Sequence, residues 1–242
     1  MTTTSLNPSA SARCVSVRPL VLVMCFGALA SDTHAQQVVM VHEEPRHRRV
    51  FTTDALRVLD VQIAPQDTTL FHTHDTPITY VTLGTSSTDQ RLLGGEWNGT
   101  EPRDPPPGRI GAVRGVMGYV ERPITHQVTN VGSTLFRLIA IANRGAGNPD
   151  AIRASPGEEV GPPNRWFRYS RLITEAGEHV AFRPATPTVA VLIRGGRVAF
   201  ESEEGWRSSL ESPGDVHVLE PGETMTVRDD GSSAEIVFVE VR

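Results

Sequence analysis

Two histidines, His72 and His74, lie two residues apart in the segment 69–74, whose composition is typical of a β-strand. Because side chains alternate between the two faces of a strand, both imidazoles are predicted to project from the same face. Two neutral imidazoles on one face supply half of a chelate for a first-row transition metal. A third histidine, His126, follows another strand-like segment, 116–120. The three histidines are therefore the first candidates for a metal site.

The sequence around these histidines resembles the two motifs of the cupin superfamily, G-x5-H-x-H-x3,4-E-x6-G and G-x5-P-x-G-x2-H-x3-N. The matching residues are His72, His74 and Gly84 in the first motif and Gly115, His126 and Asn130 in the second. These diagnostic residues lie between Gln66 and Asn130, whereas the resemblance in architecture covers most of the chain. The resemblance implies a β-barrel with the three histidines on its inner wall.

The sequence departs from the family pattern at four motif residues. Gln66 stands where the first motif opens with glycine, and Glu121 and Pro123 replace the proline and the glycine of the second motif. Ile78 and Thr79 occupy the two positions that are allowed for the glutamate of the first motif, and neither can bind a metal as a carboxylate. The resemblance therefore implies a site with three histidines and no acidic ligand.

A three-histidine site leaves a bound divalent ion with its full positive charge and with open coordination positions. Such a site suits anionic substrates and can hold oxygen beside them. Within the superfamily, three-histidine sites include iron thiol dioxygenases and diketone-cleaving dioxygenases. We expect one divalent metal ion as the cofactor, and the sequence leaves its identity open among Fe, Mn, Ni and Zn.

Four other residues are candidates for contacts with a substrate. Tyr80 and Tyr119 lie on or beside predicted strands near the ligands, where a hydroxyl could orient a substrate or donate a proton. Arg114 and Arg137 flank the same predicted site and could bind a carboxylate. The alternatives are a tyrosine that packs with its hydroxyl hydrogen-bonded, and an arginine that is solvated or salt-bridged.

Further ligand-type residues occur near the start of the chain and after the second histidine. His42, Glu43, Glu44 and His47 lie among arginines and are predicted to belong to a mobile N-terminal arm. Asp75 directly follows His74 and should point to the opposite face of the strand. We therefore do not expect Asp75 to replace the missing glutamate.

Beyond Val38 the chain alternates short runs of β-branched, aromatic and leucine residues with glycine, proline and aspartate. The runs include 56–63, 78–83, 135–141, 189–193 and 236–241. Strands at this spacing, without a long segment of helical period, predict an all-β sandwich or barrel. Together with the resemblance, the pattern predicts two cupin-type barrels of the double-stranded β-helix or jelly-roll type, a bicupin.

The two halves look like copies of one another. Phe71 and Phe182 are 111 residues apart, and so are Gly84 and Gly195. In each copy a Thr-Pro pair and an apolar run lie between the phenylalanine and the glycine. This spacing favours a duplicated barrel.

The second copy lacks the histidine pattern. The residues predicted at its three histidine positions are Arg183, Ala185 and either Thr224 or Met225. His179 and His217 occur in this half, but their spacing matches neither motif. We expect a metal site in the first half only.

The first 35 residues are predicted to be an export signal. Arg13 and Arg18 provide a positive start, an apolar run covers 20–30, and Thr33-His34-Ala35 offers a cleavage site. The apolar run is shorter than the roughly 20 residues that a bilayer span requires. The expected organisation is a signal peptide (1–35), a cupin domain with the three-histidine site (36–147), a linker (148–165) and a degenerate cupin domain (166–242). The processed protein would be periplasmic or secreted.

The composition excludes several kinds of catalytic chemistry and argues against several classes of partner. Both cysteines, Cys14 and Cys25, lie in the predicted signal, so the processed chain would have no disulfide, thiolate ligand or cysteine nucleophile. All 23 basic residues are arginine, which excludes Schiff-base chemistry on lysine. A net charge of −5 argues against nucleic acid and, after signal cleavage, against anionic membranes. The expected partner is a small-molecule ligand or substrate, and a homodimer through an edge strand is compatible with an open barrel.

Two functions fit these observations. The first is a metal-dependent enzyme that acts on a small organic molecule, with dioxygenase-like chemistry favoured over isomerase, lyase or hydrolytic chemistry. The second is a non-catalytic module that binds a small ligand or sugar in the periplasm, with the second half structural. A third hypothesis is an inactive relative in which the metal site is vestigial. A stoichiometric redox metal would favour catalysis, and an apo form without a tight metal would favour binding.

Overall fold

The computed structural model describes Met1 and residues 36–205 and 207–242, and residues 36–242 form one compact unit. The predicted export signal lies outside the described residues except for Met1. The regular elements that the structure describes are all β-strands, which confirms the predicted fold class. The described part of the chain has no helix of the length and hydropathy needed to cross a membrane.

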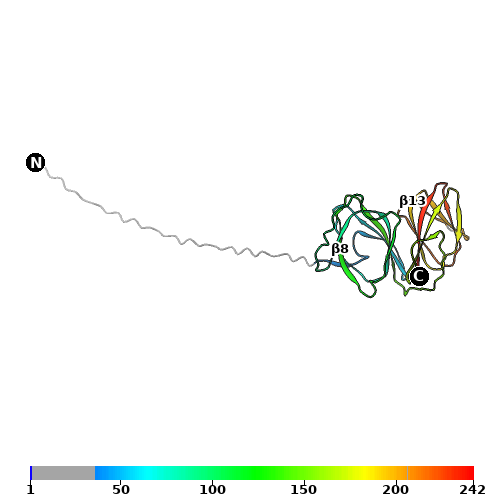
Figure 1. Ribbon diagram of the computed structural model, residues 1–242, viewed down its shortest axis with the longest axis horizontal. Coiled ribbons are helices and arrows are strands. Elements are labelled where there is room, and N and C mark those ends of the chain that lie inside the picture. Colours follow the sequence, from blue (N-terminus) through cyan, green and yellow to red (C-terminus); the bar gives the residue numbers. More distant parts are fainter. Residues whose placement is uncertain (2–35, 206) are drawn as a thin grey trace. The chain divides into compact units, whose positions relative to one another are not determined.

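The first half folds into two sheets that face each other (Figure 1). Its strands are β1 (Val38–Met40), β2 (His47–Thr52), β3 (Leu56–Ile63), β4 (Phe71–His74), β5 (Ile78–Gly84), β6 (Thr88–Leu92), β7 (Val113–Val116), β8 (Ile124–Asn130) and β9 (Phe136–Asn143). The histidine sheet has the order β1-β4-β8-β6, and the first interface sheet has the order β2-β3-β9-β5-β7.

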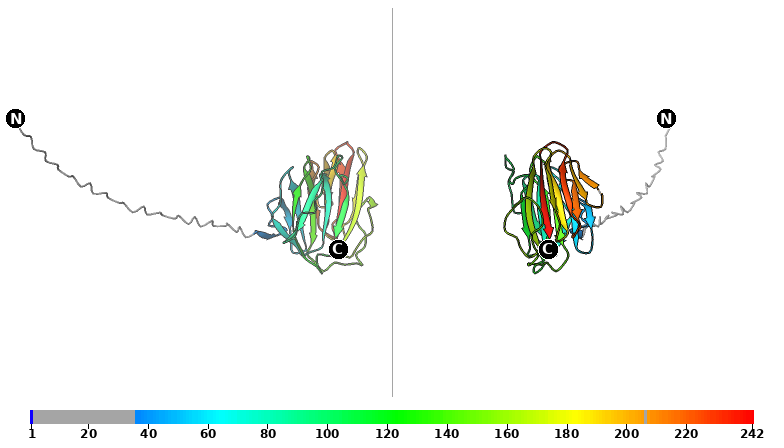
Figure 2. Two further views of the ribbon diagram at one scale, coloured as in Figure 1. Left: turned by 60° about the vertical axis from the view of Figure 1, so that its left-hand side comes forward. Right: turned by 90° about the vertical axis from the view of Figure 1, so that its right-hand side faces the viewer.

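The second half repeats this arrangement. Its strands are β10 (Glu158–Glu159), β11 (Phe167–Thr174), β12 (His179–Phe182), β13 (Thr188–Gly195), β14 (Val198–Ser202), β15 (Arg207–Leu210), β16 (Val216–Leu219), β17 (Met225–Asp229) and β18 (Ala234–Val241). The second interface sheet has the order β10-β11-β18-β13-β16, and the outer sheet has the order β12-β17-β14-β15. The orders β11-β18-β13-β16 and β12-β17-β14 correspond to β3-β9-β5-β7 and β4-β8-β6. The shared topology supports the predicted duplication, and Figure 2 shows the two barrels from two further sides.

Alternation along the strands builds three apolar cores. The core inside the first barrel contains Val41, Leu59, Val61, Ile63, Ile78, Ala140 and Ala142. The core between the two interface sheets includes Leu56, Val58, Val81, Ile139, Ile141, Phe167, Val191, Val237 and Val239. The core of the second barrel includes Leu172, Phe182, Leu192, Phe200, Val227, Ile236 and Phe238. At roughly 1.5–3 kcal/mol for each large aliphatic or aromatic side chain that is buried, these cores hold the sheets that position the site.

Apolar side chains fill the second barrel on the strands that correspond to β4 and β8. The positions of β12 and β17 that pack into its core hold Val180, Phe182, Met225 and Val227. Arg183 and Ala185 lie after β12, so the prediction that they occupy the positions of His72 and His74 is wrong. A one-residue slip moves every side chain of a strand to the other face, and an offset between two sequence repeats does not fix the register.

The segment 148–165, predicted as a linker, contains β10 and is tied to β18. Oε1 of the buried Glu240 accepts hydrogen bonds from the backbone nitrogen of Ala154 at 2.9 Å and from the nitrogen and Oγ of Ser155 at 2.6 Å each. These charge-assisted bonds hold the segment against the second barrel.

Candidate metal centre

The pairing of β4 with β8 brings the three histidines together. The strands are antiparallel, and their register places His72 opposite His126 and His74 opposite Ile124. Directly opposed residues project from the same face, so the three imidazoles share the inner face of the histidine sheet. On the other face, the hydroxyls of Thr73 and Thr125 are hydrogen-bonded at 2.8 Å. A one-residue slip of this register would turn all three histidines away from the barrel interior.

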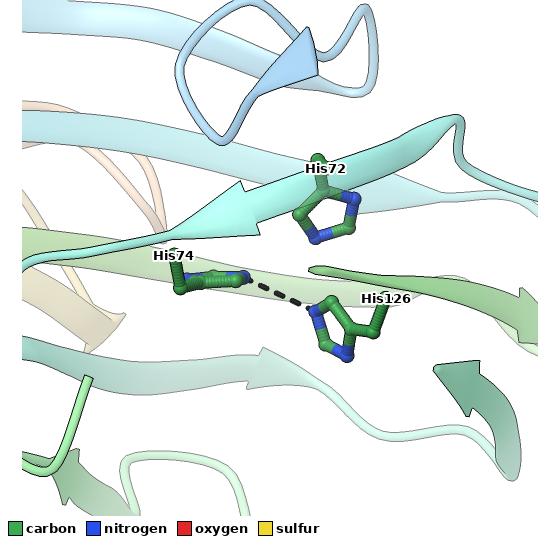
Figure 3. Close-up of side chains that lie close together, drawn as sticks. All are labelled: His72, His74 and His126. Atoms are coloured by element: carbon green, nitrogen blue, oxygen red, sulfur yellow. Dashed lines mark hydrogen bonds between the residues drawn. The ribbon is translucent and has the colours of Figure 1, made fainter. Parts of the chain in front are cut away.

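The three rings converge on one point (Figure 3). The ligand atoms of His72, His74 and His126 lie within 4.8 Å of one another, and the Nε2 atoms of His74 and His126 are 3.1 Å apart. The residues are 2, 4 and 9 % exposed, respectively. Three ligand-type nitrogens are thus enclosed in the barrel wall with little access for bulk water.

Hydrogen bonds at the far nitrogens orient two of these rings. Nδ1 of His72 donates to the backbone oxygen of Leu70 at 3.0 Å, and Nδ1 of His126 donates to Oε1 of Gln90 at 3.3 Å. In this tautomer, Nε2 of each ring carries the lone pair that a metal needs. Nδ1 of His74 is buried without a hydrogen-bond partner in the described part of the chain. No motif marked Gln90, which lies on the edge strand β6.

One of these separations already matches that of two ligands of a single metal ion. Two nitrogens bound to one ion at about 2.1 Å, at angles between octahedral and tetrahedral, lie roughly 3.0–3.4 Å apart. The separation of 3.1 Å between the two Nε2 atoms falls in this range. Among the described residues, no carboxylate belongs to the group. At the two positions of the motif's glutamate, Ile78 is buried in the core of the barrel and Thr79 donates to the backbone oxygen of Arg114 at 3.2 Å. Asp75, next to His74, is exposed.

Burial keeps the three imidazoles neutral. Burial, and after it the neighbouring histidines, lower the pKa of His72 and His126 to about 4 and that of His74 to about 2. Because a ligating histidine must be deprotonated, the site is in its metal-binding form at neutral pH.

A fourth histidine, His47, lies in the same barrel. Its ring stands edge-on to that of His72, with 4.8 Å between centroids, and its Nδ1 is hydrogen-bonded to the backbone oxygen of Val41 at 2.7 Å. Burial lowers its pKa to about 4. Oε2 of the buried Glu44 lies 3.8 Å from Nε2 of His47, too far for a hydrogen bond, so burial dominates and His47 is neutral.

The prediction of a mobile arm is therefore wrong for Glu44 and His47. Oε1 of Glu44 accepts the backbone nitrogen of Leu70 at 3.1 Å, which ties the β1–β2 turn to β4. His47 is placed by the pairing of β2 with β3, which sets it opposite Val61. A signal for this burial is hard to find in the sequence, because the register of β2 does not follow from its composition.

We expect the metal-free protein to lose stability as the pH falls from about 6.5 towards 4. The pKa values of His47, His72 and His126 are about 4 in the folded protein and 6.5 in their reference state, so only the unfolded chain takes up protons in this range. Each such histidine lowers the free energy of unfolding by about 1.4 kcal/mol per pH unit, and above about pH 6.5 its contribution is constant. Urea unfolding at several pH values measures the slope. The double variant His72→Gln, His126→Gln should have a shallower slope, and an unchanged slope would contradict the assignment.

The structure brings both candidate tyrosines to the inside of the first barrel. The ring of Tyr119 lies 4.8 Å from that of His74, and both tyrosines pack against the inner core. The hydroxyls of Tyr80 and Tyr119 are hydrogen-bonded to each other, and burial raises the pKa of each. The bond between the two hydroxyls uses one of their two protons, so the other can be donated to a bound molecule.

Of the two candidate arginines, Arg114 is on the inner side and Arg137 is not. Arg114 lies opposite Tyr80 in the β5–β7 pair, is exposed, and its charge acts to lower the pKa of both tyrosines. Arg137 binds both carboxylate oxygens of the buried Asp60, at 3.0 and 3.1 Å, and donates to the backbone oxygen of Pro213 at 3.1 Å. The prediction that Arg137 flanks the histidines is wrong, because it alternates with inward-facing residues of β9 and lies between the two barrels.

Comparisons with known proteins give the fold. No family model matches the chain, and no curated protein matches it in sequence. Salicylate 1,2-dioxygenase from Pseudaminobacter salicylatoxidans is similar in structure, with a TM-score of 0.56, 12% identity, and coverage of 81% of this chain and 77% of that one. A cupin 2 conserved barrel domain protein from Leptotrichia buccalis has a TM-score of 0.50 and 10% identity over 80% of this chain and 87% of that one. Vicilin from tomato has a TM-score of 0.50 and 13% identity over 81% and 83%. Proteins with such different names share this architecture, so the function must be argued from the site.

Proposed function

Since the chain has the two-barrel cupin fold, with a histidine triad that could bind a metal ion, we propose that it is a metal-dependent enzyme acting on a small organic acid or phenol. The observation that carries the proposal is the convergence of three buried, neutral imidazoles, two of them oriented through Nδ1. His72, His74 and His126 would hold one divalent ion, and dioxygenase-like chemistry is favoured. A bound ion would supply a Lewis acid and, if it is redox-active, a centre for oxygen chemistry.

The chain's own residues orient the substrate. The Tyr119 hydroxyl lies beside His74 and, when it accepts from Tyr80, can donate a hydrogen bond to a substrate oxygen. Arg114 supplies a positive charge on the same side for a carboxylate. Other partly buried apolar side chains that pack against the same core, including Val128, Phe136 and Leu138, can contact an apolar ring or chain and exclude water.

A binding module without turnover is the second candidate. It is favoured by the histidine group itself, which among the described residues contains three imidazoles and no carboxylate that could act as a general base within it. In either case we propose export through the segment 1–35, so that the protein meets its ligand in the periplasm or outside the cell.

Elemental analysis is the first test, on protein purified without a histidine tag from cells supplied with iron, manganese, nickel and zinc. We expect about one metal ion per chain. With iron bound, oxygen uptake is then measured with small acids, diketones and phenols, comparing wild type with Tyr119→Phe. Absence of metal above background would exclude the enzyme proposal and leave the binding module. Turnover that Tyr119→Phe does not reduce would remove the assigned role of the hydroxyl.

A further inference from the structure

The two interface sheets leave a pocket at one end of the core between the barrels. Arg171 and Ile173 continue the face of β11 that carries Phe167 into that core, and Ile193 belongs to the same core from β13. Opposite them the first half presents the loop 105–110. The resulting pocket has a volume of about 780 Å³, within the range of small-molecule sites.

One wall of this pocket is apolar. It is formed by Pro105, Pro106, Ile110, Ile173 and Ile193. Ile110 and Ile173 are 41 and 56% exposed, although both face a pocket of ligand size. An apolar ligand that covers them would gain about 25 cal/mol for each Å² removed from water.

The other wall is positively charged. Arg109, Arg171 and Arg194 line it with a single carboxylate, that of Glu235. The buried Glu235 lies 2.9 Å from Nη1 of Arg171 and 2.6 Å from Nε of Arg194. Two guanidinium groups share one carboxylate, so the lining keeps a net positive charge.

Arg171 and Arg194 are held in place for an incoming anion. Nη2 of Arg171 donates to the backbone oxygen of Gly111 at 2.7 Å, and its Nε is buried without a hydrogen-bond partner among the described residues. Glu235 orients Arg194 through Nε, while the Arg194 side chain stays 73% exposed. A preorganised guanidinium next to an apolar wall loses little freedom when it binds a carboxylate.

We propose that this pocket, formed by loop 105–110 and the edge of the second interface sheet, binds an amphipathic carboxylate, an organic acid with an apolar chain or ring. The carboxylate contacts Arg194 beside the charges of Arg109 and Arg171, and the apolar part covers Ile110 and Ile173. The proposal uses none of the histidines and does not depend on the metal-dependent activity.

Isothermal titration calorimetry of the full chain with octanoate, and with octanamide as the uncharged analogue, tests this site. We expect one-to-one binding of octanoate that weakens with salt, and binding of octanamide that is at least about tenfold weaker. Arg194→Ala and Ile173→Glu should each weaken octanoate binding by about tenfold or more, the first by removing a cation and the second by adding an anion. Arg207→Ala is the matched control, because Arg207 is 74% exposed and pairs with Glu201 outside this pocket. The affinity of the Arg207→Ala variant for octanoate should equal that of the wild type.

Two further results decide where octanoate binds. His72→Ala should leave its affinity unchanged. Loss of binding in His72→Ala with retention in Arg194→Ala would place the ligand in the histidine barrel and overturn the proposal. Equal affinities in Arg194→Ala, Ile173→Glu and Arg207→Ala, or no saturable octanoate binding to the wild type, would overturn it as well.

Discussion

His72→Ala and His126→Ala are each expected to purify without bound metal, whereas the wild type carries about one ion per chain. Each substitution removes one of three nitrogens and leaves a two-histidine chelate. It also leaves the partner that oriented the ring, Leu70 or Gln90, without its hydrogen bond. Elemental analysis of proteins purified side by side measures the loss, and circular dichroism shows whether the barrel is intact.

His179→Ala and His217→Ala are the matched controls. His179 lies on an exposed position of β12, and the ring of His217 packs 5.4 Å from that of Phe200 in the second barrel. Both variants should keep the metal content of the wild type. Metal retained in both first-barrel variants would refute the assignment of the ligands, and loss of metal in either control would point to a site that involves the second half.

The histidine triad could be predicted from the sequence because its geometry is local. His72 and His74 share a face through the two-residue period of a strand, and His126 stands at a family spacing from Gly115 and Asn130. The backbone geometry also explains why the first motif has glycine at its two ends. A Cβ on Gly84 would lie 2.6 Å from the backbone oxygen of Leu135, so this position needs glycine for a close approach. Gln66, where the motif has glycine, adopts a φ of 66°, which glycine favours.

The surroundings of the triad could not be predicted, because they depend on registers between distant strands. Tyr119 and His47 reach the barrel interior from a loop and an edge strand, and Gln90 reaches His126 through the pairing of β6 with β8. The prediction that Arg137 flanks the histidines failed for the same reason. Its side chain points away from the barrel interior by one step of alternation, and the buried Asp60 lies 77 residues away in the sequence.

Asn130→Asp is expected to destabilise the protein by roughly 4–6 kcal/mol, although it changes one amide to a carboxylate of the same shape. Asn130 is fully buried. Its Nδ2 donates to the backbone oxygens of Ile63 and Thr134, both at 2.8 Å, and its Oδ1 accepts from Ser86 Oγ at 2.7 Å and from the Gly132 nitrogen at 3.0 Å. The side chain thus joins β3, the β5–β6 connection and the β8–β9 turn.

In the aspartate variant, a carboxylate oxygen replaces the amide nitrogen and faces two carbonyl oxygens with no proton to share. Two hydrogen bonds are lost, and a buried charge is left without a cation, which is why the cost exceeds that of a single missing bond. Urea unfolding at neutral pH measures the change. Asn148→Asp makes the same chemical change at an exposed position, where Oδ1 accepts the backbone nitrogen of Asp150, and its stability should stay within about 0.5 kcal/mol of the wild type. If both variants unfold at the same urea concentration as the wild type, the four hydrogen bonds of Asn130 do not hold the end of β8, and another contact must fix the strand that carries His126.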